Sequence, residues 1–379
     1  MALRMLAVFL VACTAAADEA PLVVRSSLAP AETVFVREFP GRNERLVEQL
    51  RELCDAVGAE LHVVPAGEPY AYNHVWLQDA TEFLERSDGS GTVALAANRD
   101  RAIDAFAGDR LEGVPVLRVG EHRPDYARGE GGVSWIDWYG NLEASPPTDA
   151  WPHGRVLYGF DPASGAQLHP EVVDFLTEQG LQAPLRVDVG WLQIKHVDEM
   201  VSFLPAKGGG FYVAVPDPTA ALDVLRGLAA DGHGAAPLLG KYEAGATVAG
   251  VLADEPFVAE NERLWAQRIE PAAKKLLSEI GVDADRLVRL PVLFHAGGAA
   301  RTPNVVNALV LPGRDGAPGV VAMSDPDGPV VGGHDALRAE VVRRLEGVDA
   351  AVRFVDDRQY HKWSGNVHCA TNAIRPLRP

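Results

Sequence analysis

The chain has 379 residues, of which 47% are hydrophobic and 23% are charged. Such a chain buries one large core or two medium ones, which excludes disordered, collagen-like and coiled-coil proteins. Its 35 Lys and Arg residues against 52 Asp and Glu residues give a formal net charge of −17. This balance argues against nucleic acid as a partner, because phosphate binding needs a basic face. Three cysteines are too few for a disulfide scaffold, so the composition favours a globular enzyme.

The N-terminus carries a short apolar run, Met5–Ala12, followed by small residues. This pattern is typical of a signal peptide and is too short to span a bilayer. We predict cleavage after Ala17, so that residues 1–17 are removed and the protein is secreted or lies in a bacterial cell envelope. In an alternative interpretation, residues 10–13 are a lipobox and Cys13 carries a lipid anchor; a third is an untargeted apolar start. We expect no transmembrane span further along the chain.

Beyond this segment, apolar runs of strand length alternate with amphipathic helical stretches. Leu46, Leu50, Leu53 and Val57 recur at helical spacing, which predicts a helix that ends near Gly58. A strand at 61–65 follows, and then helices around 222–228 and 276–280, with Pro271 at a break or a fresh start. Leu337, Val341 and Leu345 predict a further helix, which Gly347 ends, and a strand is expected at 350–355. This alternation predicts an α/β fold in one domain.

One tripeptide occurs twice, as Trp76-Leu77-Gln78 and as Trp191-Leu192-Gln193. Each copy leads into acidic residues. The repetition indicates structural units that deliver polar side chains from equivalent strand ends.

Polar residues concentrate in three otherwise apolar segments, at 75–82, 195–199 and 366–372. The chain has no CxxC pair, no HExxH and no GxSxG, which excludes the commonest zinc and serine-hydrolase sites. On an extended strand, His196 and Asp198 would project from the same face. They would then form part of a site or, alternatively, a structural histidine oriented by its aspartate.

Cys369 lies between a histidine and an asparagine-containing turn in a cysteine-poor chain. This setting makes it a candidate nucleophile, and the alternative is a small buried hydrophobic residue. Cys54 flanks the apolar stripe of the first helix, which indicates packing. The two cysteines could pair, but a nucleophile requires Cys369 to be free.

These residues together suit one reaction class. Asp79 and Asp198 would each accept hydrogen bonds from a planar guanidinium group. That cation would hold a thiolate next to its central carbon, which the thiolate attacks. A histidine would protonate the departing ammonia and then take a proton from water. The residues therefore favour cysteine-dependent attack on a cationic, carbon-centred group.

Five longer segments carry these residues in a characteristic order. They are YGNLEASPP at 139–147, WLQIKHVDEMVSFLP at 191–205, GHG at 232–234, PNVVN at 303–307 and GNVHCATN at 365–372. In sequence and order they resemble the catalytic domain of the peptidylarginine deiminases, also called protein-arginine deiminases. The resemblance places this domain at residues 25–379 and implies a pentein fold, with five ββαβ blades around a pseudo-fivefold axis.

The resemblance also implies a reaction, the conversion of peptidyl-arginine to peptidyl-citrulline with loss of ammonia through a covalent thiouronium group on cysteine. The expected partners are arginine-containing proteins or peptides. Matched by motif, Cys369 would be the nucleophile and His196 the general acid and base. Asp79 and Asp198 would bind the guanidinium, and Trp76 would form an apolar wall. Arg101, in an R-x-R motif with Arg99, would recognise the peptide. The alternative for these two arginines is a solvated surface pair.

One Ca²⁺ site follows from the same resemblance. Its all-oxygen ligand set consists of the side chains of Gln78, Glu82 and Glu143 and the backbone carbonyls of Tyr139 and Leu142. A second family site is mostly lost, because alanine replaces its acidic and hydroxyl ligands at Ala80, Ala96 and Ala97. The alternative for the retained set is a hydrogen-bonded carboxylate network without metal.

Two other functions stay open. A deiminase or amidinotransferase of a small guanidine (free arginine, agmatine or methylated arginine) would need the same cysteine, histidine and carboxylates. Trp363 stands where the family can carry a substrate-contacting arginine, which leaves the peptide preference open. A secreted, calcium-stabilised binding protein without catalysis is the third candidate, although all four catalytic positions carry the required residue types.

Overall fold

The structure is a computed structural model that describes residues 19–66, 75–97, 113–120, 135–239, 242–314 and 317–377. The predicted signal peptide at 1–17, Cys13, Arg99 and Arg101 lie outside these ranges. The cleavage site, the lipid anchor and the secreted location therefore stay predictions. Among the described helices, none combines the length and the apolar character that a membrane span requires.

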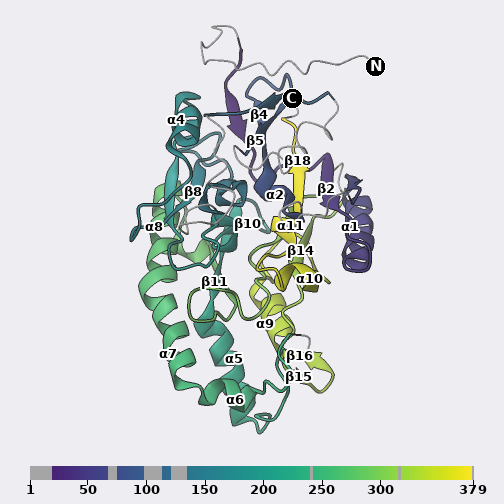
Figure 1. Cartoon of the computed structure of the whole chain (residues 1–379), viewed down its shortest axis with the longest axis vertical. Helices are drawn as coiled ribbons and strands as arrows, with labels where there is room; N and C mark the ends of the chain where they lie inside the picture. The colour runs from purple at the N-terminus through teal and green to yellow at the C-terminus, as the bar shows by residue number, and fades with distance from the viewer. Residues whose placement is uncertain are drawn as a thin grey trace, which may run out of the picture.

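Five sheets of the described chain share one strand pattern. In each, the first strand of the unit pairs antiparallel with the second, and the second pairs parallel with the third. We call these units blades 1 to 5 (Figure 1). Their strands are β4 Thr81–Arg86, β5 Thr92–Ala96 and β6 Val116–Leu117; β7 Leu142–Ala144, β8 Val156–Phe160 and β9 Leu185–Asp188; β10 Ser202–Pro205, β11 Phe211–Asp217 and β12 Leu287–Pro291; β13 Leu309–Leu311, β14 Val320–Ser324 and β17 Ala351–Val355; and β18 Thr371–Ile374, β2 Thr33–Arg37 and β3 Glu60–Val64. The strand β1, Leu22–Val24, extends blade 1 beside β4.

In blades 2 to 5, helices make the crossovers that the parallel pairs require. They are α1 Glu44–Val57 in blade 5, α4 Pro170–Glu178 in blade 2, α5 Pro218–Ala230, α6 Val248–Ala253, α7 Glu255–Leu264 and α8 Glu270–Ile280 in blade 3, and α9 Ala336–Arg344 in blade 4. In Figure 1, α5, α6 and α7 form the end of the molecule opposite the two chain termini. A small ribbon of β15 (Val330–Val331) and β16 (His334–Asp335) precedes α9. The predicted α/β fold of ββαβ units is confirmed.

The helix boundaries follow the sequence signals closely. Gly58 ends α1 in a left-handed conformation with φ 72°, and Gly281 ends α8 with φ 75°. Asp217 begins α5 by accepting hydrogen bonds from the backbone N–H groups of Thr219 and Ala220. The last long helix ends earlier than predicted, because α9 stops at Arg344 before Gly347 is reached.

Pro271 lies in the first turn of α8, where the sequence predicted a break or a fresh start. A π-helical turn at Trp265–Ile269 joins α7 to α8 without interruption. Pro271 has no N–H to donate to the preceding turn, and a wider turn accommodates that missing hydrogen bond.

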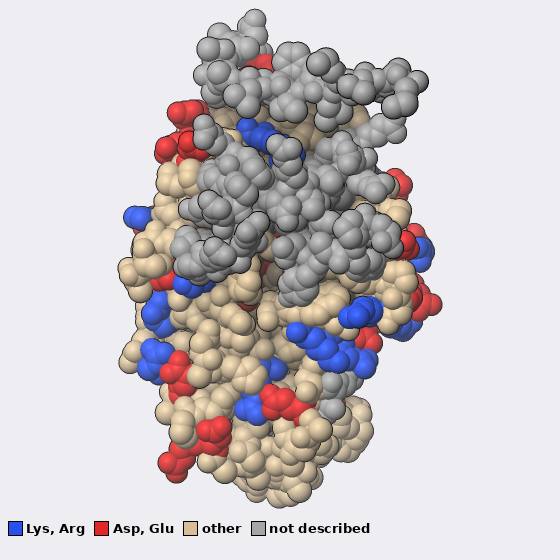
Figure 2. Space-filling model, in the orientation of Figure 1, with Lys and Arg blue, Asp and Glu red and all other residues tan. Residues whose placement is uncertain are grey.

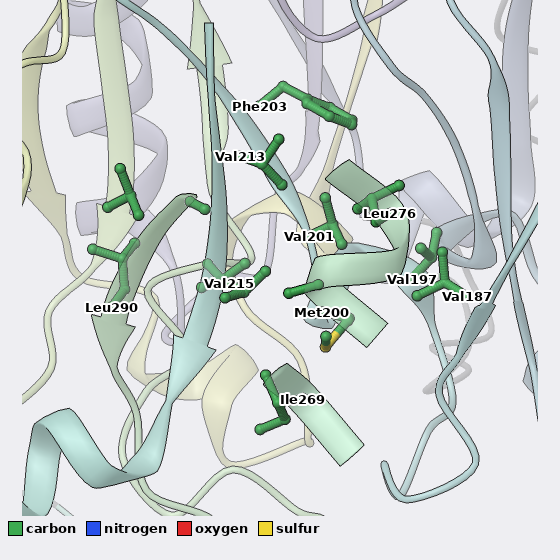
Figure 3. Close-up of a cluster of buried hydrophobic side chains, with 14 of the residues drawn as sticks. Val187, Val197, Met200, Val201, Phe203, Val213, Val215, Ile269, Leu276 and Leu290 are labelled. Atoms are coloured by element: carbon green, nitrogen blue, oxygen red, sulfur yellow. The ribbon is translucent and has the colours of Figure 1, made fainter. Parts of the chain in front are cut away.

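The largest buried cluster packs α8 and the π-helical turn against blade 3. Ile269 and Leu276 from the helical side lie among Phe203, Val213 and Val215 from the strands (Figure 3). Figure 3 also labels Val197 and Met200, which flank the polar pair Asp198 and Glu199 in the sequence. This core therefore fixes the position of the turn that carries the predicted catalytic residues.

A buried asparagine ties blade 2 to blade 3. The Asn141 carboxamide donates to the carbonyls of Ile136 (2.8 Å) and Gly159 (3.0 Å), and accepts from the N–H groups of Gly159 (2.7 Å) and Val197 (3.0 Å). The two ends of the chain are joined as well, since β18 near the C-terminus pairs with β2 near the N-terminus.

We expect Asn141→Ala to lower the free energy of unfolding by about 3 kcal/mol, because it leaves several buried backbone groups without partners. Urea unfolding at 25 °C measures this loss. The control is Arg226→Ala, which removes an ion pair with Glu262 between side chains 43% and 48% exposed and should cost less than about 0.5 kcal/mol. A loss at Asn141 as small as that of the control would contradict the bridging role.

Candidate active site

Short helical turns just before the first strand of a blade carry the site residues. The turns are α2 (Leu77–Ala80) before β4, the 3₁₀ turns η4 (Tyr139–Asn141) before β7 and η5 (Val197–Glu199) before β10, and α11 (Val367–Ala370) before β18. The polar side chains thus come from equivalent places, as predicted. The repeated tripeptide does not mark these places, because Trp76 directly precedes α2 whereas Trp191 lies in an earlier turn, against Phe294.

The predicted strand at 196–198 is wrong. His196 is the N-cap of η5, and its backbone carbonyl accepts from the N–H of Glu199 at 3.4 Å. The Glu199 carboxylate in turn accepts from the His196 N–H at 3.3 Å. Lys195 enters this turn with φ 68° and is held by an ion pair of 2.5 Å to Asp161. A tight turn, and not a two-residue strand period, brings His196 and Asp198 to the site.

Cys369 lies at the centre of the site as a free thiol. Cys54 is also free and buried, in the core cluster beside α1. The Cys369 sulfur lies 3.4 Å from Asp198 Oδ2 and 3.2 Å from the amide nitrogen of Asn307. Burial, together with the negative charges of Asp198, Asp79 and Glu199, raises the pKa of the Cys369 thiol well above its ordinary value. Without a bound cation, the cysteine is a protonated thiol at neutral pH.

The orientation of His196 follows from its partners. Its Nε2 lies 2.6 Å from the Trp135 carbonyl oxygen, which only accepts hydrogen bonds, so Nε2 carries a proton. Nδ1 faces Asp79, 3.4 Å from its Oδ1. The N–H of Gly140 donates to the same Asp79 oxygen at 3.3 Å. His196 therefore presents Nδ1 to the site, where it can give or take a proton.

Two buried polar atoms at the site are left unsatisfied. Asp198 Oδ1 and His196 Nδ1 make no hydrogen bond to the residues that the structure describes. Buried polar atoms without partners are costly, and a ligand that donates N–H groups would satisfy the carboxylate oxygen. A guanidinium group is such a ligand.

A pocket of about 70 Å³ leads to Cys369. Asp79, His196 and Cys369 line it together with four tryptophans, Trp76, Trp135, Trp138 and Trp363. Trp135 is 39% exposed, so the pocket has an aromatic wall that reaches the surface. Trp76 lies where the sequence predicted it, whereas Trp135 and Trp138 had no role assigned from the sequence.

The predicted calcium side chains line a second, smaller cavity of about 30 Å³. Gln78 donates to Glu82 at 2.9 Å and lies 3.5 Å from the Tyr139 carbonyl, while Leu142 begins the strand that carries Glu143. Burial and the charge of Glu143 raise the pKa of Glu82 well above its ordinary value, and burial raises that of Glu143 to about 7. The described residues contain no cluster of three or more His, Cys, Asp or Glu side chains with metal-binding geometry. The predicted set has two carboxylates, one amide and two carbonyls.

His368 lies between the two cavities. Its Nδ1 is 3.0 Å from Asp198 Oδ2, and its Nε2 is 3.3 Å from Glu143 Oε1. Sequence reasoning assigned no role to His368 or to Asn307, although both stand in segments that carry the family resemblance. Their contacts arise between blades, which no local pattern predicts.

The comparisons with known proteins agree with this geometry. The profile of the family described as Protein-arginine deiminase (PAD) matches residues 14–378. Protein-arginine deiminase type-4 of Rattus norvegicus is 30% identical over 378 residues and type-1 of Homo sapiens 30% over 379 residues. These alignments cover 94% and 95% of this chain but 54% and 55% of the relatives, so the chain spans about half the length of the curated relatives it matches.

Solved structures share the fold. The agmatine deiminase of C. jejuni superposes with a TM-score of 0.52 at 11% identity, over 94% of this chain and 96% of that one. The agmatine deiminase of Enterococcus faecalis gives 0.51 at 14% identity, over 94% and 96%. At such low identity these neighbours establish the fold alone, and they confirm the predicted pentein arrangement.

Proposed function

Because this chain belongs to the protein-arginine deiminase family, we propose that it hydrolyses peptidyl-arginine to peptidyl-citrulline and ammonia, with Cys369 as the nucleophile. One observation carries the proposal. A buried thiol lies 3.4 Å from Asp198, at the end of a tryptophan-walled pocket that also contains Asp79 and His196. A cation with N–H donors fits this combination of negative charge and apolar wall.

Binding and activation of the thiol are coupled in this proposal. The arginine side chain enters between the tryptophans, and its guanidinium donates to Asp79 and Asp198. Its positive charge offsets the two carboxylates that oppose ionisation of Cys369. The substrate therefore favours the thiolate at the moment when the nucleophile is needed.

The reaction then proceeds in two halves. The reaction starts with a proton on each ring nitrogen of His196. The thiolate adds to the guanidinium carbon, and one nitrogen leaves as ammonia after it accepts the proton from His196 Nδ1, which leaves a thiouronium group on the sulfur. Water then gives a proton back to His196 Nδ1 and its oxygen adds to the same carbon; the carbon–sulfur bond breaks, and the remaining hydroxyl proton passes to solvent. The products are citrulline and the regenerated thiolate.

The pocket wall supports a peptide as the substrate. Trp135 at the rim is 39% exposed, so the pocket is continuous with the surface, where a polypeptide can run past it. On the face shown in Figure 2, acidic side chains lie next to basic ones among the described residues. Arg99 and Arg101, which lie outside the described residues, are assigned to the substrate backbone by resemblance.

We also propose a single Ca²⁺ bound by Gln78, Glu82, Glu143 and the carbonyls of Tyr139 and Leu142. Two buried carboxylates share this cavity, and the charge of Glu143 raises the pKa of Glu82. The Arg375 guanidinium offsets part of their charge, while its hydrogen bonds go to the carbonyls of Ala29 and Val310. The Gln78 amide can present its oxygen by rotation. When bound, the ion would neutralise the carboxylate pair and order the segments before β4 and β7. The replacements at Ala80, Ala96 and Ala97 are all buried and offer no side-chain oxygen for a second ion.

We expect citrulline to form from a blocked arginine peptide and not from free arginine. Cys369→Ser should reduce turnover of the peptide by at least about 10⁴-fold, whereas Cys54→Ala, a change at the other buried cysteine, should retain it. A colorimetric citrulline assay on both substrates measures this. Turnover of free arginine alone would move the activity to small guanidines, and no turnover of either would overturn the proposal.

We expect Gly140→Ala to reduce kcat by about 10²-fold or more with little change in fold. A Cβ at this position would lie 2.5 Å from His196 Nδ1 and 2.7 Å from Asp79 Oδ1, so it would separate the acid–base group from the carboxylate. Gly227→Ala is the matched control, because a Cβ there meets no atom within 4 Å. Equal activity of both variants would exclude a role of the His196–Asp79 geometry in turnover.

We expect Ca²⁺ to raise the thermal unfolding temperature, with a gain of about 2.7 kcal/mol at a hundredfold excess over the dissociation constant. The double variant Glu82→Gln with Glu143→Gln should melt at a higher temperature than the wild type in chelator, and should no longer respond to Ca²⁺. Differential scanning calorimetry with Ca²⁺, Mg²⁺ and chelator measures this. Glu48→Gln, a change at a glutamate that is 59% exposed beside an equally exposed Arg45, is the control. A calcium response that survives the double variant would contradict the assignment.

A further inference from the structure

Asn307 holds the nucleophile by two atoms at once. Its Oδ1 accepts from the Cys369 backbone N–H at 3.2 Å, and its Nδ2 lies 3.2 Å from the Cys369 sulfur. The same Nδ2 donates to the Asp198 carbonyl oxygen at 3.3 Å. Asn307 is 1% exposed, so water does not compete for these contacts.

The chemistry of the partners fixes which end of the carboxamide faces the sulfur. The Cys369 N–H can only donate, so it must face the amide oxygen. The Asp198 carbonyl can only accept, so it must face the amide nitrogen. The second hydrogen of that nitrogen is then directed at the sulfur. The contact is therefore an N–H donor to sulfur in either charge state of the thiol.

The carboxylates around the sulfur oppose its ionisation, and among the backbone groups a hydrogen bond at Asn366 favours it. Asp198 is 3.4 Å away, and Asp79 and Glu199 add negative charge. His196 presents Nδ1 to the same pocket, and the His368 imidazole is engaged by Asp198 and Glu143. Of the described side chains, Asn307 is the one that donates a hydrogen bond to the sulfur.

We propose that Asn307 is a further catalytic residue, which stabilises the Cys369 thiolate through its Nδ2–H both before attack and when the sulfur leaves the thiouronium carbon. The thiol proton goes to water, and Asn307 keeps its own hydrogens. The inference rests on the proposed function in taking Cys369 as the nucleophile. It adds a donor that the four predicted catalytic residues do not provide.

The test measures ionisation of Cys369 without substrate. The rate of alkylation by iodoacetamide is followed against pH, with the modified cysteine identified by peptide mass spectrometry because the sequence contains two further cysteines, Cys13 and Cys54. In Asn307→Ala we expect the midpoint to rise by about 1 pH unit, which appears below the midpoint as about tenfold slower alkylation at constant pH.

Asn304→Ala is the matched control. Asn304 is equally buried in the same turn, but its amide donates to the Glu199 carbonyl at 2.8 Å and its oxygen accepts from the Val306 N–H at 3.0 Å. We expect alkylation of Cys369 in this variant to follow the wild-type pH dependence. If Asn307→Ala melts below the assay temperature, Asn307→Ser serves in its place, since its hydroxyl can still accept a hydrogen bond.

An unchanged midpoint in the Asn307 variant, or an equal shift in Asn304→Ala, would overturn the proposal. The readout does not depend on turnover. A protein that alkylates as expected but releases no citrulline would refute the proposed function and leave the role of Asn307 at the thiolate standing.

Discussion

Negative charge buried around one thiol is the constraint on which this structure depends. Asp79, Asp198 and Glu199 are each less than 10% exposed, and isolated carboxylates at such depth are costly. The scaffold offsets part of this cost with backbone N–H groups, from Gly140 to Asp79 and from His196 to Glu199. Burial, together with the charge of Asp198, raises the pKa of Glu199 well above its ordinary value. The remaining negative charge favours a cation, and it would favour binding of a guanidinium over a neutral urea.

Such a centre can be built only if several blades converge on it, because no single blade carries all the groups. Asp79 comes from blade 1, His196 and Asp198 from blade 3, and Cys369 from blade 5. Buried asparagines join the blades. Asn307 connects Cys369 with Asp198. Asn372 donates to the carbonyls of Leu77 and Thr81, at the start of β4. Asparagine suits this task because one uncharged side chain both donates and accepts. The position of Cys369 also depends on the N-terminal part of the chain, because β18, the strand that follows Cys369, pairs with β2.

The sequence predicted what local patterns determine. The apolar stripe of α1 and its glycine stop lie as expected, and so do β3, α5, α8 and β17. The resemblance selected Asp79, His196, Asp198, Cys369 and Trp76, which the structure brings together. The strand expected at 196–198 is not formed. A spacing of two residues fits any i, i+2 pair and is therefore weak evidence, whereas the hydrogen bonds between His196 and Glu199 stabilise a 3₁₀ turn. Asn307, His368, Trp135 and Trp138 were missed as functional groups because their contacts at the site arise between distant segments of the chain.

His368 shows how the two cavities share one polar network. Its two nitrogens face Asp198 at 3.0 Å and Glu143 at 3.3 Å. Burial opposes the charged ring, but the charges of Glu143 and Asp198 outweigh burial and raise the pKa of His368, because only the imidazolium donates from both nitrogens. A positive charge next to Glu143 would therefore weaken the contact between Glu143 and His368, and this would change the hydrogen bond between His368 and Asp198. Asp198 Oδ2 is also 3.4 Å from the Cys369 sulfur. A cation next to Glu143 would thus act on Cys369 through His368 and Asp198, without touching substrate.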